Sequence, residues 1–430
     1  MATFKRGRWV MEAVSGVARA DRRSCEYEAY LPDPLLKREM NLTGEVAADV
    51  ADAETAIARL DKGATALADT EALARLLLRA ECVASSRIEG LEVGPRRVLR
   101  AEAARQMGEP PGDVTAEEVL GNIDAMRAAL EAGERDDVIT RETILEIHRC
   151  LLINTPLGNH AGRIREVQNW IGGSAYNPCS AAYVPPPPDA VPELLDDLAE
   201  FCNGDSLPAV MQAALAHAQF ETIHPFADGN GRTGRALVHL ILRRRGLSRQ
   251  VQPPVSLVLA TRADDYIRGL TDYRYVGAPD SEGAIAGLNA WVGTFAAACV
   301  RATEDAEAFE RRCQAMEAAW RERIGTIRRD SSVDLLLRLL PGTPVLSVKT
   351  AVALLGRSKP QVNQAVARLE GAGVLRQVTV GRRNRAFEAR DVIDAFADLE
   401  RQLASPSGDT EVAPPSRPVP ARRQWMRPTS

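Results

Sequence analysis

Apolar residues in the first quarter of the chain recur with the period of an α-helix. From residue 41 to residue 107 they stand three or four positions apart, so they share one face of each predicted helix. The linker MGEPPGD (107–113) interrupts the pattern. Thr115, with acidic residues two and three positions later, then marks a helix start, and helical spacing continues to residue 152. The apolar positions before the linker are Leu42, Val46, Val50, Ile57, Leu60 and Leu73–Leu78.

Residues 163–184 depart from this helical pattern. β-forming residues stand on both sides of the turn region GGSAYNP (172–178), which predicts a β-hairpin. The run Pro185–Pro188 ends it, because proline has no N–H to donate. The fold class is therefore mainly α, with one short hairpin. Helical spacing then returns, and the predicted helices cover 191–203, 208–223, 233–245, 262–275 and 284–299.

The C-terminal third has a pattern of its own. Residues 300–329 form a charged helical connector, and residues 331–400 are predicted to form three helices, a hairpin around Gly381–Asn384 and a last helix. This order resembles a winged helix-turn-helix. Residues 401–430 contain six prolines and few apolar residues, so we expect a disordered tail there.

Composition and charge limit the function classes. Of the 430 residues, 45% are hydrophobic and 26% are charged, as in an ordinary soluble globular protein. The net charge of −4 excludes general binding of nucleic acid by the whole chain. We expect neither a membrane span, for which no stretch looks long and apolar enough, nor a signal peptide, because Glu12 interrupts the short apolar run. The seven cysteines form no C-x-x-C pair, which predicts free thiols in a reducing cytoplasm.

The string HPFADGNGRTGR (224–235) carries the candidate chemistry. The preceding helix delivers His224 into a loop, where a neutral imidazole can act as a base. Asp228 offers a hard oxygen suited to Mg²⁺. Glycines expose backbone N–H groups just before a helix predicted to begin at about Thr233, which makes an anion site suited to phosphates. Two arginines three positions apart can reach oxygens of one polyphosphate chain.

This string resembles the signature of the Fic family, H-x-F-x-D/E-G-N-G-R-x-x-R, at every fixed position. Such a long pattern is far more specific than a short glycine motif. The resemblance implies a helical Fic fold that transfers AMP from ATP to a protein hydroxyl, with Mg²⁺ as cofactor. It implies these roles: His224 as general base, Asp228 as Mg²⁺ ligand, Arg232 as support for the phosphates and the loop, Arg235 as γ-phosphate ligand, Asn230 with the amides of Gly229 and Gly231 as phosphate ligands, and Thr233 and Gly234 as further nucleotide-binding residues.

Two alternatives compete with this interpretation. A Gly-rich turn between two helices, with a surface histidine, would need only one or two of these residues. A zinc site is the second alternative, because His217, Glu221 and His224 are spaced four and three apart and share one helix face. Their order is not H-E-x-x-H, and a zinc site leaves the phosphate loop unexplained. Three further histidines have no partner pattern and receive no role: His148, His160 and His239.

The string SSRIEG (85–90) resembles the family's inhibitory motif, S/T-x-x-x-E-G/N, through Ser85, Glu89 and Gly90. Its position before the catalytic core matches the Fic subclass with an N-terminal inhibitory helix. A carboxylate beside Arg235 would form a bidentate pair and occupy the arginine that the γ-phosphate needs. The alternative for Glu89 is a solvated helix charge. In parts of the family this glutamate also helps water to remove AMP from a modified target, and the sequence leaves that reaction open.

The 163–184 hairpin stands where Fic proteins place a flap, which pairs with the main chain of the target as an added strand. Such pairing would register a target hydroxyl near His224, and the alternative is a hairpin that contacts no target. Tyr266 stands where the family often has a tyrosine near the nucleotide base. A helix tyrosine half buried in the core is the alternative, and Trp291 is a predicted core residue.

The C-terminal unit has features of a DNA-binding module. Polar residues near the start of its third helix would face the major groove, and arginines of the hairpin would contact the phosphate backbone. Ten basic and seven acidic residues between 333 and 400 give only a modest positive charge. The alternative is a module for dimerisation or target docking. The residues concerned are Lys359, Gln361, Asn363, Gln364, Arg376, Arg382, Arg383 and Arg385.

The sequence therefore predicts two function classes. The leading one is autoinhibited AMP transfer to Tyr, Thr or Ser of a target protein, and the alternative is a DNA-binding regulator whose core senses a nucleotide. The intact His224 favours the enzyme, because a nucleotide sensor has no use for a base. Self-modification, a homodimer and a nucleotide other than ATP stay open. The predicted segments are 1–110 (N-terminal helices with the inhibitory motif), 111–300 (Fic core), 301–330 (helical connector), 331–400 (winged helix-turn-helix) and 401–430 (tail).

Overall fold

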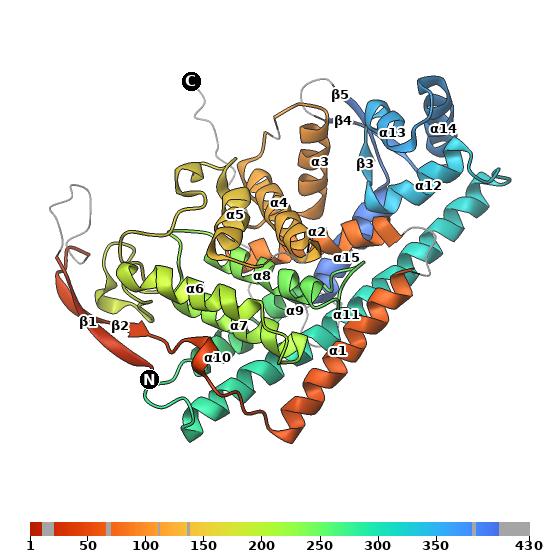
Figure 1. Ribbon diagram of the computed structural model, residues 1–430. Coiled ribbons are helices and arrows are strands. Elements are labelled where there is room, and N and C mark those ends of the chain that lie inside the picture. The colour runs from red at the N-terminus through yellow and green to blue at the C-terminus, as the bar shows by residue number, and fades with distance from the viewer. Residues whose placement is uncertain (11–20, 66–69, 111, 136–137, 381–383, 404–430) are drawn as a thin grey trace, which may run out of the picture.

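The computed structural model describes the chain except residues 11–20, 66–69, 111, 136–137, 381–383 and 404–430. Helices make up most of the described chain, and two small antiparallel sheets lie at opposite ends of the molecule (Figure 1). The mainly α fold class is thereby confirmed. Of the predicted tail 401–430, only the residues up to Leu403 are described, and they end a helix.

An N-terminal sheet forms in a part of the chain for which the sequence predicted no strand. Strand β1 (Thr3–Trp9) pairs antiparallel with β2 (Cys25–Leu31), and Phe4 lies opposite Tyr30. Both strands mix charged and aromatic residues, so neither shows the apolar alternation that marks a half-buried strand. That missing alternation explains why the sequence did not predict this sheet.

The hairpin predicted at 163–184 is wrong, because no strand forms in these described residues. One isolated antiparallel bridge joins Ile171 to Tyr183. Gly172 and Gly173 both have positive φ, at 76° and 74°, and a Cβ on Gly173 would lie 2.4 Å from the carbonyl oxygen of Ser180. This tight turn leaves a compact loop in place of a regular ladder.

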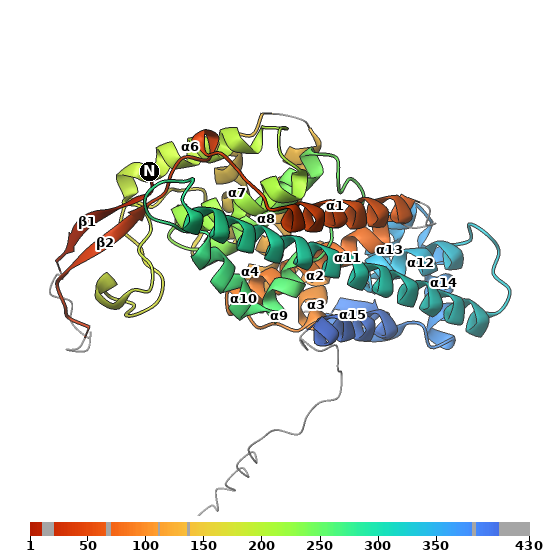
Figure 2. The same ribbon diagram turned by 90° about the horizontal axis from the view of Figure 1, so that it is seen from below.

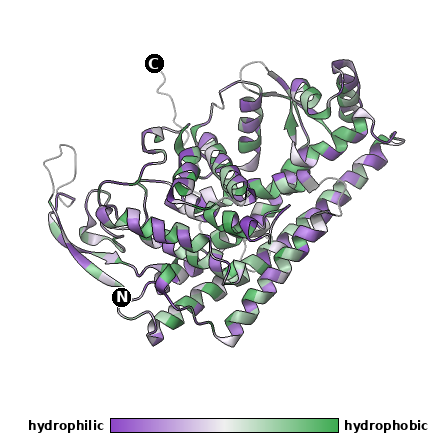
Figure 3. Ribbon diagram, viewed as in Figure 1, coloured by the Kyte–Doolittle hydropathy of each residue, from purple (hydrophilic) through white to green (hydrophobic). Residues whose placement is uncertain are grey.

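The helical body holds one continuous core. Most helices in Figure 3 carry both hydrophobic and hydrophilic positions, as expected for helices with one buried face. The helices are α1 (Gly44–Thr65), α2 (Thr70–Ile88), α3 (Pro95–Gln106), α4 (Val114–Glu134), α5 (Arg141–Leu152), α6 (Val191–Cys202), α7 (Ala209–Ile223), α8 (Asn230–Arg244), α9 (Val255–Thr261) and α10 (Ala263–Asp272). Single 3-10 turns lie at Leu35–Lys37, Gly158–His160, Pro178–Ser180 and Pro188–Ala190.

Helices α7 and α8 form the centre of this core. Every residue of α7 except Glu221 is buried, and α8 is buried from Asn230 to Leu242. The helix predicted to begin near Thr233 begins at Asn230 instead, because Gly229 takes a left-handed conformation (φ 76°) and starts the helix there. The motif glycines at 231 and 234 therefore lie inside the first turns of α8 and not in a loop.

Helix α11 (Glu282–Ile324) runs without a break through the predicted boundary at residue 300 and lies beside α1 (Figure 2). One window of it is long and apolar enough to cross a membrane by length and composition, so the expectation that no stretch qualifies was wrong. Within that window 56% of the residues are buried in the fold. Trp291 is buried, as predicted, and its indole N–H donates to the carbonyl of Ala214 (2.7 Å). Because its apolar window is largely buried in the fold, α11 is a core helix.

The C-terminal elements follow the predicted order, with one extra strand. Helix α12 packs on α2, and a Cβ on Gly342 would lie 2.6 Å from the Cα of Ala72. Arg79 donates to the carbonyl of Gly342 (2.7 Å). The unit thus lies directly against the helical body, and the segment boundaries stay predictions. Its elements are α12 (Ser332–Gly342), β3 (Val345–Leu346), α13 (Val348–Leu355), α14 (Lys359–Gly371), β4 (Arg376–Val380), β5 (Asn384–Glu388) and α15 (Arg390–Leu403), with sheet order β3-β5-β4.

Two of the seven cysteines are paired. Cys25 of β2 and Cys179 of the 163–184 loop form a disulfide across 154 residues of sequence, so the prediction that all thiols are free was wrong. The spacing gave no sign of this pair, because the unpredicted N-terminal sheet brings Cys25 to the loop. The other five cysteines are free, at 82, 150, 202, 299 and 313.

Candidate active site

His224 stands at the turn where α7 ends. Its backbone is left-handed (φ 49°, ψ 61°), and its N–H donates to the carbonyl of Phe220 (2.9 Å). Such a backbone is rare outside glycine and persists only where the surroundings hold it. Arg165 and Asn169 supply that hold by donating to the His224 carbonyl at 2.9 and 3.3 Å. The backbone of His224 is therefore fixed at the end of α7.

The electrostatics of this turn keep His224 neutral. Burial, and next the positive charge of Arg165, lower the pKa of His224 to about 4, so its lone pair is available at neutral pH. The Nδ1 atom lies 3.8 Å from a carboxyl oxygen of Glu221, which is too long for a hydrogen bond. Burial raises the pKa of Glu221 to about 8, so this neighbour is mostly protonated at neutral pH.

A histidine without a predicted role holds the loop between α7 and α8. The ring of His148 stacks on Phe226 at 3.6 Å between centroids. Its Nδ1 accepts from the N–H of Gly162 (3.0 Å), and its Nε2 lies 3.0 Å from the carbonyl of Asp228. Burial lowers the pKa of His148 to about 4, so the ring is neutral and Nε2 is the donor. No sequence pattern indicates this contact, because both partners are backbone groups.

The Asn230 side chain closes the same loop. Its amide accepts from the N–H of Phe226 (2.8 Å) and donates to the Phe226 carbonyl (2.9 Å). Both functions of the amide are thus used inside the loop, and not for the phosphate contact expected of this side chain. What remains for an anion is the backbone: the first N–H groups of α8 have no partner within the helix.

The first turn of α8 is shaped for close approach. The Thr233 hydroxyl donates a hydrogen bond to the Gly229 carbonyl (2.9 Å), which tightens the turn. A Cβ on Gly231 would lie 1.9 Å from Oε1 of Glu89, and a Cβ on Gly234 would lie 2.9 Å from the ring of Phe220. The glycine at 231 therefore admits a ligand oxygen, and the one at 234 admits helix α7.

Arg232 and Asp228 lie together at the edge of this turn. Arg232 donates to Oδ1 of Asp228 (2.8 Å), while its Nε and Nη1 are buried without a partner. Buried N–H groups without an acceptor are costly, so an arriving anion would satisfy them. Asp228 is 46% exposed and presents a single carboxylate. Among the described residues no three His, Cys, Asp or Glu side chains gather as a metal site.

Glu89 lies against Arg235, as the inhibitory motif predicts. Arg235 donates to Oε1 of Glu89 at 2.7 Å, and to the hydroxyl and the carbonyl of Ser85 at 2.8 Å each. Burial opposes ionisation of Glu89, but the attraction of Arg235 outweighs it and lowers the pKa of Glu89 below its ordinary value. Gly90 turns the chain just after Glu89 with φ 80°. The carboxylate is thus ionised and paired.

Tyr266 lies behind Arg235. It is buried, and its hydroxyl lies 2.8 Å from Nε2 of His217 and 3.3 Å from Nη1 of Arg235. This position fits the core alternative for Tyr266 and gives it a contact with the arginine. His217 is used by the same contact, so His217, Glu221 and His224 do not converge on a metal.

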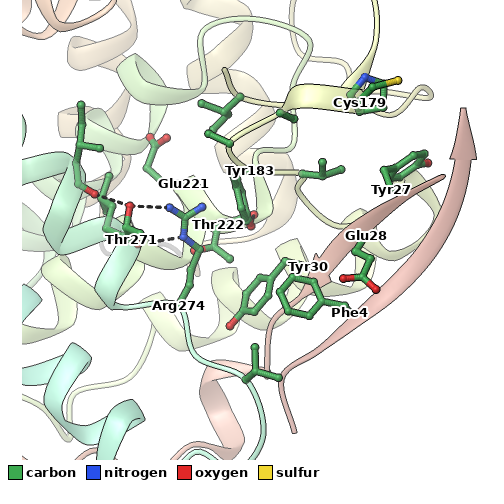
Figure 4. A pocket seen from close by; sticks show the side chains of 18 of the residues that line it. Phe4, Tyr27, Glu28, Tyr30, Cys179, Tyr183, Glu221, Thr222, Thr271 and Arg274 are labelled. Carbon is green, nitrogen blue, oxygen red and sulfur yellow. Dashed lines mark hydrogen bonds between the residues drawn. The ribbon is translucent and has the colours of Figure 1, made fainter. Parts of the chain in front are cut away.

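A cavity of about 600 Å³ opens beside Glu221 and Thr222, just before His224. Figure 4 shows its two sides: Phe4, Tyr27, Glu28 and Tyr30 come from the N-terminal sheet, and Thr271 and Arg274 come from the end of α10 and the segment after it. The 171–184 loop supplies the remaining wall, including Cys179 and Tyr183. The cavity therefore extends from the N-terminal sheet to Glu221, whose carboxyl group lies 3.8 Å from Nδ1 of His224.

The fold and the site together define a class of protein. The site has the groups that phosphoryl- or nucleotidyl-transfer enzymes use. They are a neutral imidazole, a helix N-terminus with free N–H groups, an exposed carboxylate and two buried arginines.

Comparison with known proteins narrows this class to a family. Residues 138–242 match the Fic/DOC family and residues 47–131 match its N-terminal region. The chain therefore contains a Fic/DOC domain, and the resemblance seen in the motif is confirmed.

Named relatives agree with this assignment. The chain is 38% identical to protein adenylyltransferase fic-1 of Caenorhabditis elegans over 156 residues, which is 35% of this chain and 27% of that protein. It is 31% identical to protein adenylyltransferase Fic of Culex quinquefasciatus over 210 residues, 46% of this chain and 39% of that protein. The match thus spans well under half of either relative. A solved Fic family protein from Desulfovibrio desulfuricans shares the fold, with a TM-score of 0.50, 23% identity and coverage of 82% of this chain and 98% of that one.

Proposed function

We propose that this protein is an adenylyltransferase, which moves AMP from ATP to a Tyr, Thr or Ser hydroxyl of a target protein. The observation that carries the proposal is the assembled site: neutral His224 stands beside the free N-terminus of α8 and two buried arginines. The names of the relatives, protein adenylyltransferases, support the same reaction.

The residues support a direct transfer. His224 takes the proton of the target hydroxyl, the hydroxyl oxygen bonds to the α-phosphorus, and the bond from that phosphorus to the leaving pyrophosphate breaks. The amides at the start of α8 and the unpartnered nitrogens of Arg232 stabilise the negative charge that shifts onto the phosphates. Arg235 holds the γ-phosphate.

Mg²⁺ fits this site as a partly solvated ion. The single carboxylate of Asp228 is exposed, and Mg²⁺ prefers one or two carboxylates with phosphate oxygens and water as its other ligands. When bound, the ion would neutralise charge on the α- and β-phosphates. Asp228 would then exchange its pairing with Arg232 for the ion.

Glu89 inhibits this reaction by occupying the γ-phosphate position. Its carboxylate contacts Arg235 and lies over Gly231 at the first turn of α8. A γ-phosphate would meet both a like charge and an occupied arginine there. Removal of AMP from a modified target by water, with Glu89 as the assisting group, remains a proposal for the same site.

The 163–184 segment is proposed to contact the target as a loop and not as a regular strand. Its bridge at Ile171 and Tyr183 places backbone groups along the cavity that leads to His224. A copy of this chain could serve as the target, which would give self-modification. A homodimer is also proposed, without a residue that marks its interface.

DNA binding by residues 331–400 is the second candidate function, and the exposed face of α14 favours it. Lys359, Gln361, Asn363 and Gln364 are all exposed, as are Arg376 and Arg385 on the strands; Arg382 and Arg383 lie outside the described residues. Between residues 328 and 385 the sequence has eleven basic and three acidic residues, a net charge of +8. A DNA-shift assay on the full chain tests it, and binding that does not weaken with salt would contradict it.

A cytoplasmic location remains a proposal, and the Cys25–Cys179 disulfide bears on it, since disulfides are rare in a reducing cytoplasm. Alkylation of the protein directly in cells tests this. A cytoplasmic protein should label at both cysteines, whereas protection of the pair would contradict that location.

Label transfer from α-labelled ATP with Mg²⁺ tests the enzyme itself. Glu89→Gly should label itself or a lysate protein strongly, the wild type weakly, and Glu89→Gly with His224→Ala not at all. If no variant transfers label from ATP or another nucleotide, the transferase proposal fails and the DNA-binding regulator takes its place.

A further inference from the structure

The cavity beside Glu221 is walled in part by elements that the Fic/DOC matches do not cover. The N-terminal sheet (residues 3–9 and 25–31) and α10 with its following segment (263–276) lie outside the matched ranges 47–131 and 138–242. The matched ranges therefore do not account for the chemistry of these two walls.

The N-terminal sheet is fixed in place as a wall. The Cys25–Cys179 disulfide ties it to the 163–184 loop, and Trp9 packs edge-to-face on Trp170 at 5.1 Å. The N–H of Tyr30 donates to the carbonyl of Val184 (2.9 Å). A covalent bond, an aromatic contact and a backbone hydrogen bond therefore hold the sheet to the loop from both ends of β2.

The cavity gathers exposed apolar side chains from three separate elements. Four large apolar residues that line it are unusually exposed: Phe4 (47%), Ile171 (40%), Ile267 (60%) and Val276 (59%). Single exposed apolar residues are ordinary, but several that converge on one hollow indicate a binding surface. A cavity of about 600 Å³ is of the size that encloses a compact ligand, and it can take a large side chain together with its backbone.

Charge divides the cavity into two ends. Glu26 and Glu28 of β2 line the cavity and are exposed; in the strand register Arg8 lies opposite Glu26, and Arg6 lies opposite Glu28 at 3.5 Å. At the other end Arg274 stacks on Tyr183 at 3.8 Å. Glu221, the remaining acidic residue of the lining, stands beside His224. The β2 end therefore offers two exposed carboxylates, and a cationic side chain of a target can pair with them in place of the two arginines of β1.

We propose that this cavity takes the segment of the target that carries the modified hydroxyl, and that the N-terminal sheet selects a large apolar side chain beside that hydroxyl and a Lys or Arg further along. The inference rests on the proposed AMP transfer. Continuity supports it, since Glu221 and Thr222 line the cavity and Nδ1 of His224 lies 3.8 Å from the carboxyl group of Glu221. Phe4 and Ile267 are the specificity-determining residues for the apolar side chain, and Glu26 and Glu28 for the cation.

A peptide library tests the proposal on the full chain. The Glu89→Gly protein is given Mg²⁺, labelled ATP and short peptides with a central Tyr, Thr or Ser and random flanking positions. The labelled peptides should be enriched in aromatic or large aliphatic residues at one position near the hydroxyl, and in Lys or Arg at a second position.

Matched variants locate the preference. Phe4→Ser and Ile267→Ser, from opposite walls, should each lower kcat/KM for an enriched peptide about tenfold or more and remove the apolar preference. Glu26→Gln with Glu28→Gln should remove only the basic preference. Val138→Ser, an exposed position (73%) that does not line the cavity, should change neither.

The outcomes separate this inference from the transferase itself. The inference is overturned if the labelled peptides show no enriched residue type at any flanking position, or if the apolar preference survives both Ser substitutions. Label on lysate proteins but on no peptide also overturns it, while the transferase stands. Label on neither, with no self-label, means that AMP transfer itself fails.

Discussion

Replacing Glu89 tests whether one carboxylate restrains the whole reaction. Glu89→Gly removes the group that Arg235 holds at 2.7 Å and frees the space above Gly231. Arg235 would keep its two bonds to Ser85 and its contact with Tyr266. The arginine therefore stays in place, ready for a phosphate.

The size of the effect follows from this contact. A hydrogen bond between charged groups contributes about 1.5–3 kcal/mol, and the 34% exposure of Glu89 places it at the low end, because solvent screens the pair. That corresponds to about tenfold in ATP affinity. A misplaced α-phosphate adds up to about a hundredfold in rate. The two factors multiply, so we expect kcat/KM for ATP to rise about 10- to 1,000-fold in Glu89→Gly.

The assay is the initial rate of label transfer, with ATP binding measured in parallel by calorimetry. Glu89→Gln keeps the volume and loses the charge, so its rate should fall between wild type and Glu89→Gly. Glu92→Gly, an exposed acidic position close by, serves as a control and should behave as wild type. If Glu89→Gly bound ATP no more tightly and transferred AMP no faster than wild type, the inhibitory role of this contact would be refuted.

Three further predictions concern the surroundings of the site. The pKa of Glu221 in the folded state, about 8, exceeds its ordinary value of 4.5, so the folded state holds a proton that the unfolded state releases. The free energy of unfolding should therefore fall by about 2 kcal/mol between pH 6.5 and 8. In denaturant unfolding, Glu221→Gln should show a weaker dependence of this free energy on pH. His148→Ala should loosen the loop and lower kcat about 10- to 100-fold, while His160→Ala, an exposed histidine, should leave kcat unchanged; equal kinetics would refute the loop role of His148. Cys25→Ser with Cys179→Ser should raise KM for a protein target and leave ATP binding unchanged, and an unchanged KM would count against a fixed wall.

The sequence predicted the arrangement of the site well, because the motif is local. His224, the glycines and the two arginines are brought together by one turn between two helices, so their spacing alone indicates the arrangement. Glu89 was also predictable, since the family resemblance links it to Arg235 across 146 residues. The fold class followed for a similar reason: period-3.6 spacing is a property of each helix by itself.

What the sequence could not predict depends on distant partners. His148 acts on backbone groups of Asp228 and Gly162, which no side-chain pattern reveals. The Cys25–Cys179 pair and the N-terminal sheet required knowledge of which segments meet. Residues 163–184 misled for the opposite reason, since local β propensity was overridden by two left-handed glycines and a tight turn.

Helix α2 would make the proposed inhibition by Glu89 both firm and easily released. Arg79 ties it to Gly342 on one side, and Glu81 accepts from the N–H of Ser256 (2.7 Å) on another, so the helix is held by the C-terminal unit and by α9. Glu89 lies just beyond its last helical residue, followed by Gly90, which has positive φ and open space around it. The carboxylate can therefore leave Arg235 by rotation of residues 89 and 90 alone, while Ser85 keeps the arginine aimed at the γ-phosphate position. An inhibitor of this kind is displaced without repacking the core, because only the end of the helix has to move.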